Sequence, residues 1–235
     1  MKSDVQEILI LYILKIYDTD SSSDVCIEDS FIATGDDLVA VKSGWDEYGI
    51  AYGRRSSDIT IRRITGSSPF SGIAVGSETS GGVENVLAEH INLFNVGVGI
   101  HVKTNIGRGG VIRNITVSNV YMENARRGIK IAGDVGGHPD ESFDPNALPV
   151  VKDVIIKNVW GVKVLQAGLI HGLKDSPFTG VCLSNINLRG DTRAGSRSPP
   201  PWTCSDVSGA ARQVSPWPCS ELSSSLQTNT CSSLF

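Results

Sequence analysis

Short stretches of alternating apolar and polar residues recur along the chain at nearly even spacing. Six of them share one order of residue types: apolar, any residue, apolar, then two polar residues. They begin at residues 25, 59, 86, 115, 154 and 181 and read VCIEDSFI, ITIRRITG, VLAEHINL, ITVSNVYM, VIIKNVWG and VCLSNINL. A period of two predicts β-strands. Because the repeats follow one another every 27–39 residues, they predict a solenoid whose units bury their apolar faces on their neighbours.

The fifth position of the repeat is polar in all six units: Asp29, Arg63, His90, Asn119, Asn158 and Asn185. Amides that recur at one turn position suit a hydrogen-bonded ladder between stacked coils. Leucine-rich and helical repeats fit poorly because no segment keeps a 3.6-residue period, and a large β-sandwich would not explain the constant polar position. The sequence therefore predicts an all-β fold, a right-handed parallel β-helix over residues 1–190. Residues 191–235, rich in Ser, Pro and Cys, are expected to form a tail that packs on the helix.

A second strand is expected about 13 residues after each repeat start, at LVAVK, GIAVG, GIHVK and GIKIA. Stacking these segments places two apolar columns inward, namely Val39, Ile73, Ile100 and Ile129, and Val41, Val75, Val102 and Ile131. Since side chains alternate across a strand, two other columns point outward, namely Ala40, Ala74, His101 and Lys130, and Lys42, Gly76, Lys103 and Ala132. Asp37 and Ser71 share the position just before this strand.

Two adjacent carboxylates, Asp36 and Asp37, stand on the same outer face in the stretch TGDDLVAVKSG. With a rise of about 4.8 Å per coil, they lie roughly 10 Å from Lys103 along the stack. Small residues between them (Gly72, Ala74, Gly76 and Gly99) are expected to form the floor of a groove. Hydrolysis of an acidic polysaccharide needs such groups: one carboxyl donates a proton, another activates water, and a lysine binds a uronate carboxylate. The alternative is that Gly-Asp-Asp only caps a turn.

The motifs TGDD, SGIAVGSE and GIHVKTNIGRGG, with the spacing between them, resemble glycoside hydrolase family 28, the polygalacturonases, and especially its plant branch. The resemblance extends over about residues 18–225. It implies a parallel β-helix enzyme that hydrolyses α-1,4-galacturonosyl bonds of pectin with inversion, without a metal or other cofactor. It also implies that Asp36 is the general acid, that Asp37 helps to activate water, and that Lys103 binds a substrate carboxylate.

Three positions depart from the family pattern. The slot of its Asn-Thr-Asp motif falls on Ile13, Leu14 and Lys15, so the first catalytic aspartate is replaced. The histidine of Gly-His-Gly aligns with Ser71, and the arginine of Arg-Ile-Lys aligns with His101, a weaker cation. Both are kept as candidate substrate-binding residues. The alternatives are a catalytically impaired, truncated remnant that still binds pectin, and a purely structural or protein-binding solenoid.

Composition and charge limit the classes of partner that the protein is expected to bind. Among 235 residues there are 25 Gly and only two Met, which favours a turn-rich β architecture. The net charge of −4 gives no support to nucleic-acid binding. The one strongly apolar run, ILILYILKI (residues 8–16), is too short to span a bilayer and is expected to be a first strand or a misassigned N-terminus. A monomer that binds pectin (homogalacturonan), with no nucleic-acid or membrane partner, is therefore expected.

Cysteine usage points to an oxidising compartment. Three of the five cysteines lie in the tail, where Cys204 and Cys219 bracket a loop that needs a crosslink, so this disulfide is predicted. A different pairing with Cys231 stays open. Together with the family resemblance, this predicts a secreted cell-wall protein.

The four histidines have no metal-binding spacing, and Asn114-Ile115-Thr116 is a glycosylation sequon.

Overall fold

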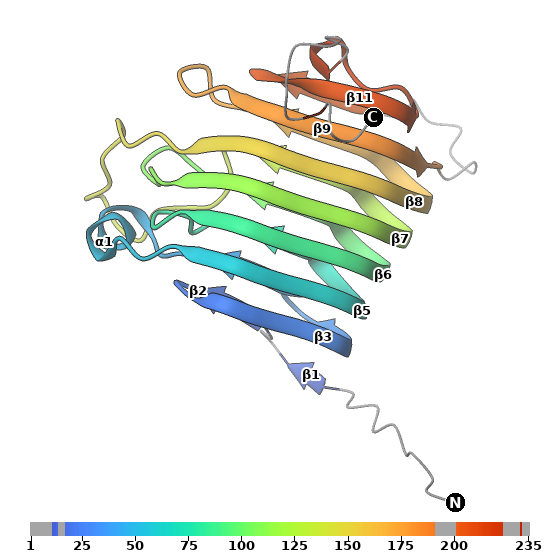
Figure 1. The fold of residues 1–235 in the computed structure, drawn as a ribbon, viewed down its shortest axis with the longest axis horizontal. Coiled ribbons are helices and arrows are strands. Elements are labelled where there is room, and N and C mark those ends of the chain that lie inside the picture. Colours follow the sequence, from blue (N-terminus) through green and yellow to red (C-terminus); the bar gives the residue numbers. More distant parts are fainter. Residues whose placement is uncertain (1–10, 14–16, 191–200, 223–230, 232–235) are drawn as a thin grey trace, which may run out of the picture.

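The six predicted repeats stack on one another in register. In the computed structural model, which describes residues 11–13, 17–190, 201–222 and 231, Val25 pairs with Ile59, and this column continues through Val86, Ile115, Val154 and Val181. All pairings between its named strands are parallel, in the order β1-β3-β5-β6-β7-β8-β9-β11 (Figure 1). The prediction of a right-handed parallel β-helix is confirmed.

The elements are β1 (Leu11–Ile13), β2 (Tyr17–Asp20), β3 (Ser23–Thr34), β4 (Val39–Lys42), α1 (Asp46–Tyr52), β5 (Ser56–Val75), β6 (Val83–Lys103), β7 (Val111–Ala132), β8 (Val150–His171), β9 (Phe178–Leu188), β10 (Trp202–Ser205), β11 (Val207–Ser215) and η1 (Ser220–Leu222). In β5 to β8 the two strands expected in each repeat merge into one element of 20–22 residues. The chain can turn inside these strands because each corner needs only one residue in the left-handed region.

The recurrent polar position supplies one of these corners. All six residues at this position have φ between 51° and 57°, a conformation that Asn and Asp adopt more readily than other non-glycine residues. Asn158 Nδ2 donates to Asn119 Oδ1 at 3.0 Å, and Asn185 Nδ2 donates to Asn158 Oδ1 at 2.9 Å. The predicted amide ladder is therefore confirmed.

Two further ladders were not predicted. In one, Asn114 Nδ2 donates to Asn85 Oδ1 (2.7 Å) and Asn85 Nδ2 donates to Asp58 Oδ1 (3.0 Å). In the other, Asn124 Nδ2 donates to Asn95 Oδ1 (2.7 Å). These five residues all have positive φ, so the coils turn at three stacked corners. The asparagine of the sequon belongs to the first of these ladders.

The predicted inward columns form the core. Val39 pairs with Ile73, which pairs with Ile100 and then Ile129, and each of these side chains is at most 2% exposed. Burial of one such side chain stabilises the fold by about 1.5–3 kcal/mol, so a column repeated through every coil is the main source of stability. The same register keeps the outward columns aligned along the stack.

Helix α1 was not predicted. It lies between β4 and β5, at one end of the strands (Figure 1), and stops at Gly53, whose φ of 61° is typical of a helix C-cap. The loop over residues 133–149 contacts this helix: the hydroxyl of Tyr48 donates to Asp140 Oδ2 at 2.6 Å.

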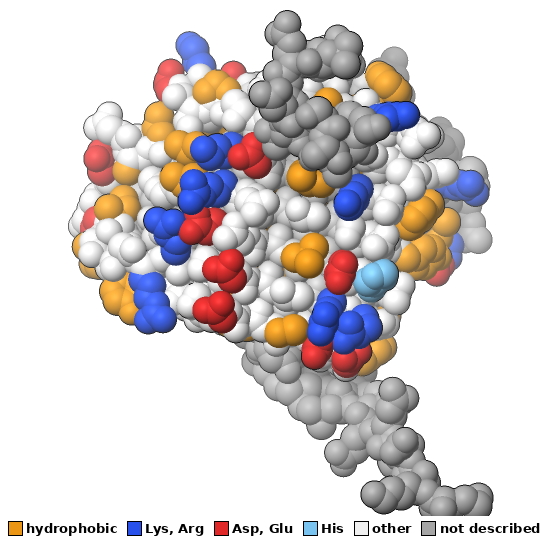
Figure 2. Space-filling model, viewed as in Figure 1, with side chains coloured by type: hydrophobic (Ala, Val, Ile, Leu, Met, Phe, Trp, Pro, Cys, Tyr) orange, Lys and Arg blue, Asp and Glu red, His pale blue; other side chains and the backbone are white. Residues whose placement is uncertain are grey.

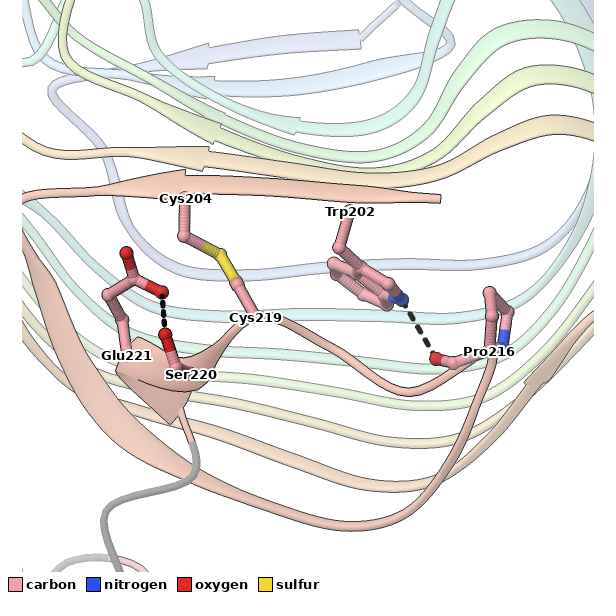
Figure 3. The surroundings of a disulfide bond; sticks show 6 residues. All are labelled: Trp202, Cys204, Pro216, Cys219, Ser220 and Glu221. Carbon is pink, nitrogen blue, oxygen red and sulfur yellow. Dashed lines mark hydrogen bonds between the residues drawn. A yellow bond between two sulfur atoms is a disulfide. The ribbon is translucent and has the colours of Figure 1, made fainter. Parts of the chain in front are cut away.

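The C-terminal segment continues the stack. Strand β10 pairs with β8 and β11 pairs with β9, while the boundary expected near residue 190 stays a prediction. The predicted disulfide between Cys204 and Cys219 is confirmed (Figure 3). Near it, Trp202 Nε1 donates to the carbonyl of Pro216 at 2.9 Å. A second disulfide joins Cys182 to Cys231.

The N-terminal apolar run contributes one short strand to the stack. Residues 11–13 of the apolar run form β1, which pairs with β3; the rest of the run, including Lys15, lies outside the described residues. Among the helices that the structure describes, none is long and apolar enough to cross a membrane. On the face seen in Figure 2, basic and acidic side chains lie next to one another. Pairs that link adjacent coils include Arg63 with Asp29.

Candidate active site

A buried carboxylate joins three consecutive coils. Asp37, just before β4, is 7% exposed. Its Oδ1 accepts a hydrogen bond from the backbone N–H of Ser71 in β5 at 2.9 Å, and its Oδ2 accepts one from Lys103 Nζ in β6. The stacking therefore brings together the aspartate, serine and lysine that the sequence placed on one face.

The second carboxylate, Asp36, is partly exposed. Its N–H donates to Thr34 Oγ1 at 3.2 Å, and its Oδ1 accepts the N–H of Asp37 at 2.8 Å. Its carbonyl accepts a bond from Ser68 Oγ at 2.5 Å. Asp36 therefore makes local hydrogen bonds of the kind that a turn cap makes, and its side chain remains partly exposed to solvent.

Opposing effects set the ionisation of Asp37. Burial alone would raise the pKa of this carboxyl group, but the charge of Lys103 and the hydrogen bonds from Lys103 and Ser71 outweigh it. The pKa of Asp37 therefore lies below its ordinary value, and the group is ionised in mildly acidic solution. An ionised, oriented carboxylate stands beside a second, solvent-accessible one.

His101 does not supply the positive charge that an arginine would supply in its place. The side chain is 7% exposed, and Ser71 Oγ lies 2.9 Å from its Nδ1. Burial, together with the neighbouring charges of Lys103 and Lys130, lowers its pKa to about 3. His101 is therefore a neutral hydrogen-bonding group, and its buried Nε2 has no partner among the described residues.

The positive charges of the site are Lys103 and two further lysines. Lys130 pairs in register with His101 one coil further along and is half-buried. Burial and the charge of Arg127 lower its pKa. Lys42 contacts Asp18 (2.9 Å) and Glu78 (3.3 Å). The sequence placed Lys42 and Lys130 on this face but did not show which would be neutralised.

The groove floor differs from the expectation. Gly72 and Gly99 do not face outward: a Cβ on Gly72 would lie 2.5 Å from Leu93, and one on Gly99 2.5 Å from Met122. Both contacts are with core residues, so these glycines admit bulky core side chains. Ala74 is outward in register with His101, yet it is fully covered. The expectation of an open glycine-lined floor was therefore wrong.

Potential metal ligands in the described part of the chain gather only at Cys204, Cys219 and Glu221. The two cysteines are joined as a disulfide (Figure 3), and so their sulfur atoms are not free to bind a metal. We call Asp36, Asp37, Ser71, His101, Lys103 and Lys130 the acid cluster. Its functional groups are carboxyl groups, a hydroxyl, a neutral imidazole and ammonium groups.

The outer face of the parallel β-helix thus holds two carboxyl groups beside lysines, and a pair of carboxyl groups is the kind of chemistry that glycoside hydrolysis uses. The family described as Glycosyl hydrolases family 28 matches residues 16–215. The chain belongs to this family.

Known relatives agree with this assignment. A probable polygalacturonase of Vitis vinifera is 44% identical over 191 residues, which cover 81% of this chain and 38% of that protein. Polygalacturonase-2 of Solanum lycopersicum is 28% identical over 77% of this chain and 37% of its own length. The chain thus spans well under half the length of these two relatives.

Solved structures show the same fold. The crystal structure of a hyperthermoactive exopolygalacturonase from Thermotoga maritima has a TM-score of 0.69 and 27% identity, over 84% of this chain and 42% of that one. A polygalacturonase from Erwinia carotovora ssp. carotovora has a TM-score of 0.62 and 25% identity, over 83% of this chain and 46% of that one.

Proposed function

We propose that the protein hydrolyses α-1,4-galacturonosyl linkages of pectin by an inverting acid/base mechanism. The observation that carries this proposal is the pairing of a buried, ionised Asp37 with an adjacent, accessible Asp36 on the outer face of the coil stack. In this role Asp36 protonates the departing glycosidic oxygen, and Asp37 accepts a proton from the attacking water.

Other residues of the cluster orient these groups and the substrate. Lys103 keeps Asp37 ionised, and in the absence of substrate its ammonium is occupied by that carboxylate. A bound uronate would share this ammonium with Asp37. Ser71 and the neutral His101 offer hydrogen bonds to sugar hydroxyls. The role of substrate-binding cation then falls on Lys103 together with Lys130.

A second candidate function is pectin binding without efficient turnover. It is favoured by the lysine at position 15, where the family pattern has its first aspartate. In this case the acid cluster would bind a galacturonate chain but would not activate water well enough to cleave it.

The remaining parts of the proposal concern location and assembly. We propose that the protein is secreted to the cell wall, because its two disulfides persist in oxidising compartments. We also propose that it acts as a monomer. Non-reducing electrophoresis of the secreted and intracellular fractions of an expressing cell would test the location.

The test of hydrolysis is the release of reducing ends from polygalacturonic acid between pH 4 and 6. We compare the wild-type chain with Asp36→Asn and, as a matched control, Asp24→Asn, an exposed aspartate in β3. A hydrolase loses activity in the first variant and keeps it in the second. If the folded wild-type chain binds the polymer and releases no reducing ends, the second candidate function replaces the first.

A further inference from the structure

Three exposed aromatic side chains gather at helix α1, apart from the acid cluster. Trp45, Tyr48 and Tyr52 are 41%, 55% and 64% exposed. Their spacing of three and four residues places them on one side of the helix. Large aromatic side chains normally contribute to stability through burial, and a contiguous exposed group of them is typical of a binding surface.

Buried contacts hold this aromatic group in position. Asp46, in the first turn of α1, is fully buried; its Oδ1 is paired with Arg108, and its Oδ2 lies 2.8 Å from Nδ1 of His138. The hydroxyl of Tyr48 is held by Asp140. Because the helix is anchored at its first turn, a ligand would meet aromatic rings that are already ordered, which lowers the entropic cost of binding.

The aromatic group lines an open cavity of about 500 Å³, whose other walls are Asp20, Ser21, Ser22, Gly44, Gly49 and Arg54. Arg54 is exposed, and its guanidinium forms no hydrogen bond or ion pair with the part of the chain that the structure describes. Asp20 accepts a bond from Ser21 Oγ at 2.9 Å. The cavity therefore combines aromatic faces with one available cation, one carboxylate and two hydroxyl groups.

We propose that this cavity is a second sugar-binding site, which takes a galacturonate unit of an acidic polysaccharide. The apolar C–H face of a sugar ring can pack on Trp45 or Tyr52, since aromatic side chains suit surfaces that are apolar on one side and wet on the other. Arg54 can bind the uronate carboxylate, and Asp20 can accept bonds from sugar hydroxyls. The class of ligand rests on the proposed function.

The site lies along the coil stack from the acid cluster, with Asp20 and Lys103 in one column of paired residues. Asp20 pairs in register with Lys42, and Lys103 follows the same column two coils further along, since Val41, Val75 and Val102 are paired. Three coil steps of about 4.8 Å separate Asp20 from Lys103 by roughly 14 Å. A ligand that contacts both places must be an extended chain, as a polygalacturonate is.

Calorimetry with a galacturonate hexasaccharide tests the site on an Asp36→Asn background, in which turnover does not interfere. We expect Trp45→Ala and Arg54→Gln each to weaken binding on the order of tenfold. The matched controls are Trp160→Ala, since Trp160 on β8 is 43% exposed, and Arg189→Gln, also exposed. Both controls should bind as the parent does. Circular dichroism verifies that each variant is folded.

Several results would overturn the proposal. Equal affinity of Trp45→Ala and Trp160→Ala would do so, as would a parent that binds no hexasaccharide, or equally tight binding of neutral maltohexaose. Sedimentation that shows a dimer lost in Trp45→Ala would instead assign the aromatic group to self-association. The two proposals can fail separately. If the wild-type chain releases reducing ends but Trp45→Ala does not change the affinity for the hexasaccharide, only the second site is refuted. If hexasaccharide binding depends on Trp45 but the wild-type chain releases no reducing ends, only the hydrolase activity is refuted.

Discussion

Replacement of Lys103 by methionine would test how much the ion pair in the acid cluster contributes to stability. Methionine keeps most of the side-chain length but removes the charge. The side chains of Asp37 and Lys103 are 6% and 16% exposed, so the variant would leave a buried carboxylate that is supported only by hydrogen bonds from Ser71 among the described residues. Breaking a buried pair in this way costs about 3–5 kcal/mol. Because Lys103 is partly solvated, we expect about 3 kcal/mol, which lowers Tm by roughly 6–12 °C in a chain of this size.

The loss should depend on pH in a defined direction. In the wild-type protein the pKa of Asp37 is below its usual value of 3.8. Its stabilising contribution is therefore present above pH 3.8 and disappears as the pH falls through the lower, folded-state pKa. Without Lys103, burial raises the pKa of Asp37, so the variant gains relative stability when this group is protonated. The difference in Tm between wild type and variant should shrink as the pH falls from 7 to 3.

Thermal unfolding followed by circular dichroism measures both quantities, with Lys163→Met as the matched control. Lys163 Nζ lies 2.6 Å from Glu123 Oε1, but these side chains are 57% and 43% exposed. Such a surface pair contributes less than about 1 kcal/mol. Equal losses in the two variants, or a difference in Tm that stays constant with pH, would refute the reasoning.

Three other changes give sharp expectations. Arg108→Met should cost about 3–5 kcal/mol, measured by urea unfolding, because it leaves the fully buried Asp46 without its cation; a loss below 1 kcal/mol would contradict this. Asn158→Ala should lower stability by about 1–3 kcal/mol, since it breaks two ladder bonds and places a Cβ-bearing residue without a side-chain amide at φ 55°. Asn158→Gly should be less harmful, and the reverse order in a parallel melt would exclude backbone strain as a cause. Replacing Cys182 and Cys231 by serine opens a crosslink between residues 49 apart and should cost about 4 kcal/mol; an unchanged Tm would show that the crosslink does not constrain the unfolded chain.

The coil architecture was predictable because its determinants are local and repeated. Alternation indicated strands, and the polar fifth position indicated the corner that Asn119, Asn158 and Asn185 form. Aligning the start of each repeat with the start of the next was enough to place Asp37, Ser71 and Lys103 on neighbouring coils. The two other ladders were harder to predict. Their asparagines recur in the same register, but the residues around them do not follow a comparably constant pattern.

Loops that meet across several coils were not predictable. Arg108, in the loop between β6 and β7, is fully buried beside Asp46 from another coil. The partner of Cys182, which is Cys231, likewise comes from a distant part of the chain, 49 residues away. Nothing in the local sequence around either residue specifies such a partner.

By itself, the sequence determined the β-helix, the register of its coils and the alignment of Asp37, Ser71 and Lys103 on neighbouring coils, because a strand period and a one-residue corner are properties of short segments. Only the tertiary structure decided the protonation of that face. Burial and neighbouring lysines make His101 neutral, while Lys103 outweighs burial at Asp37 and keeps it ionised. These outcomes depend on the solvent excluded and the charges gathered by other coils, and such quantities exist only once the chain is stacked.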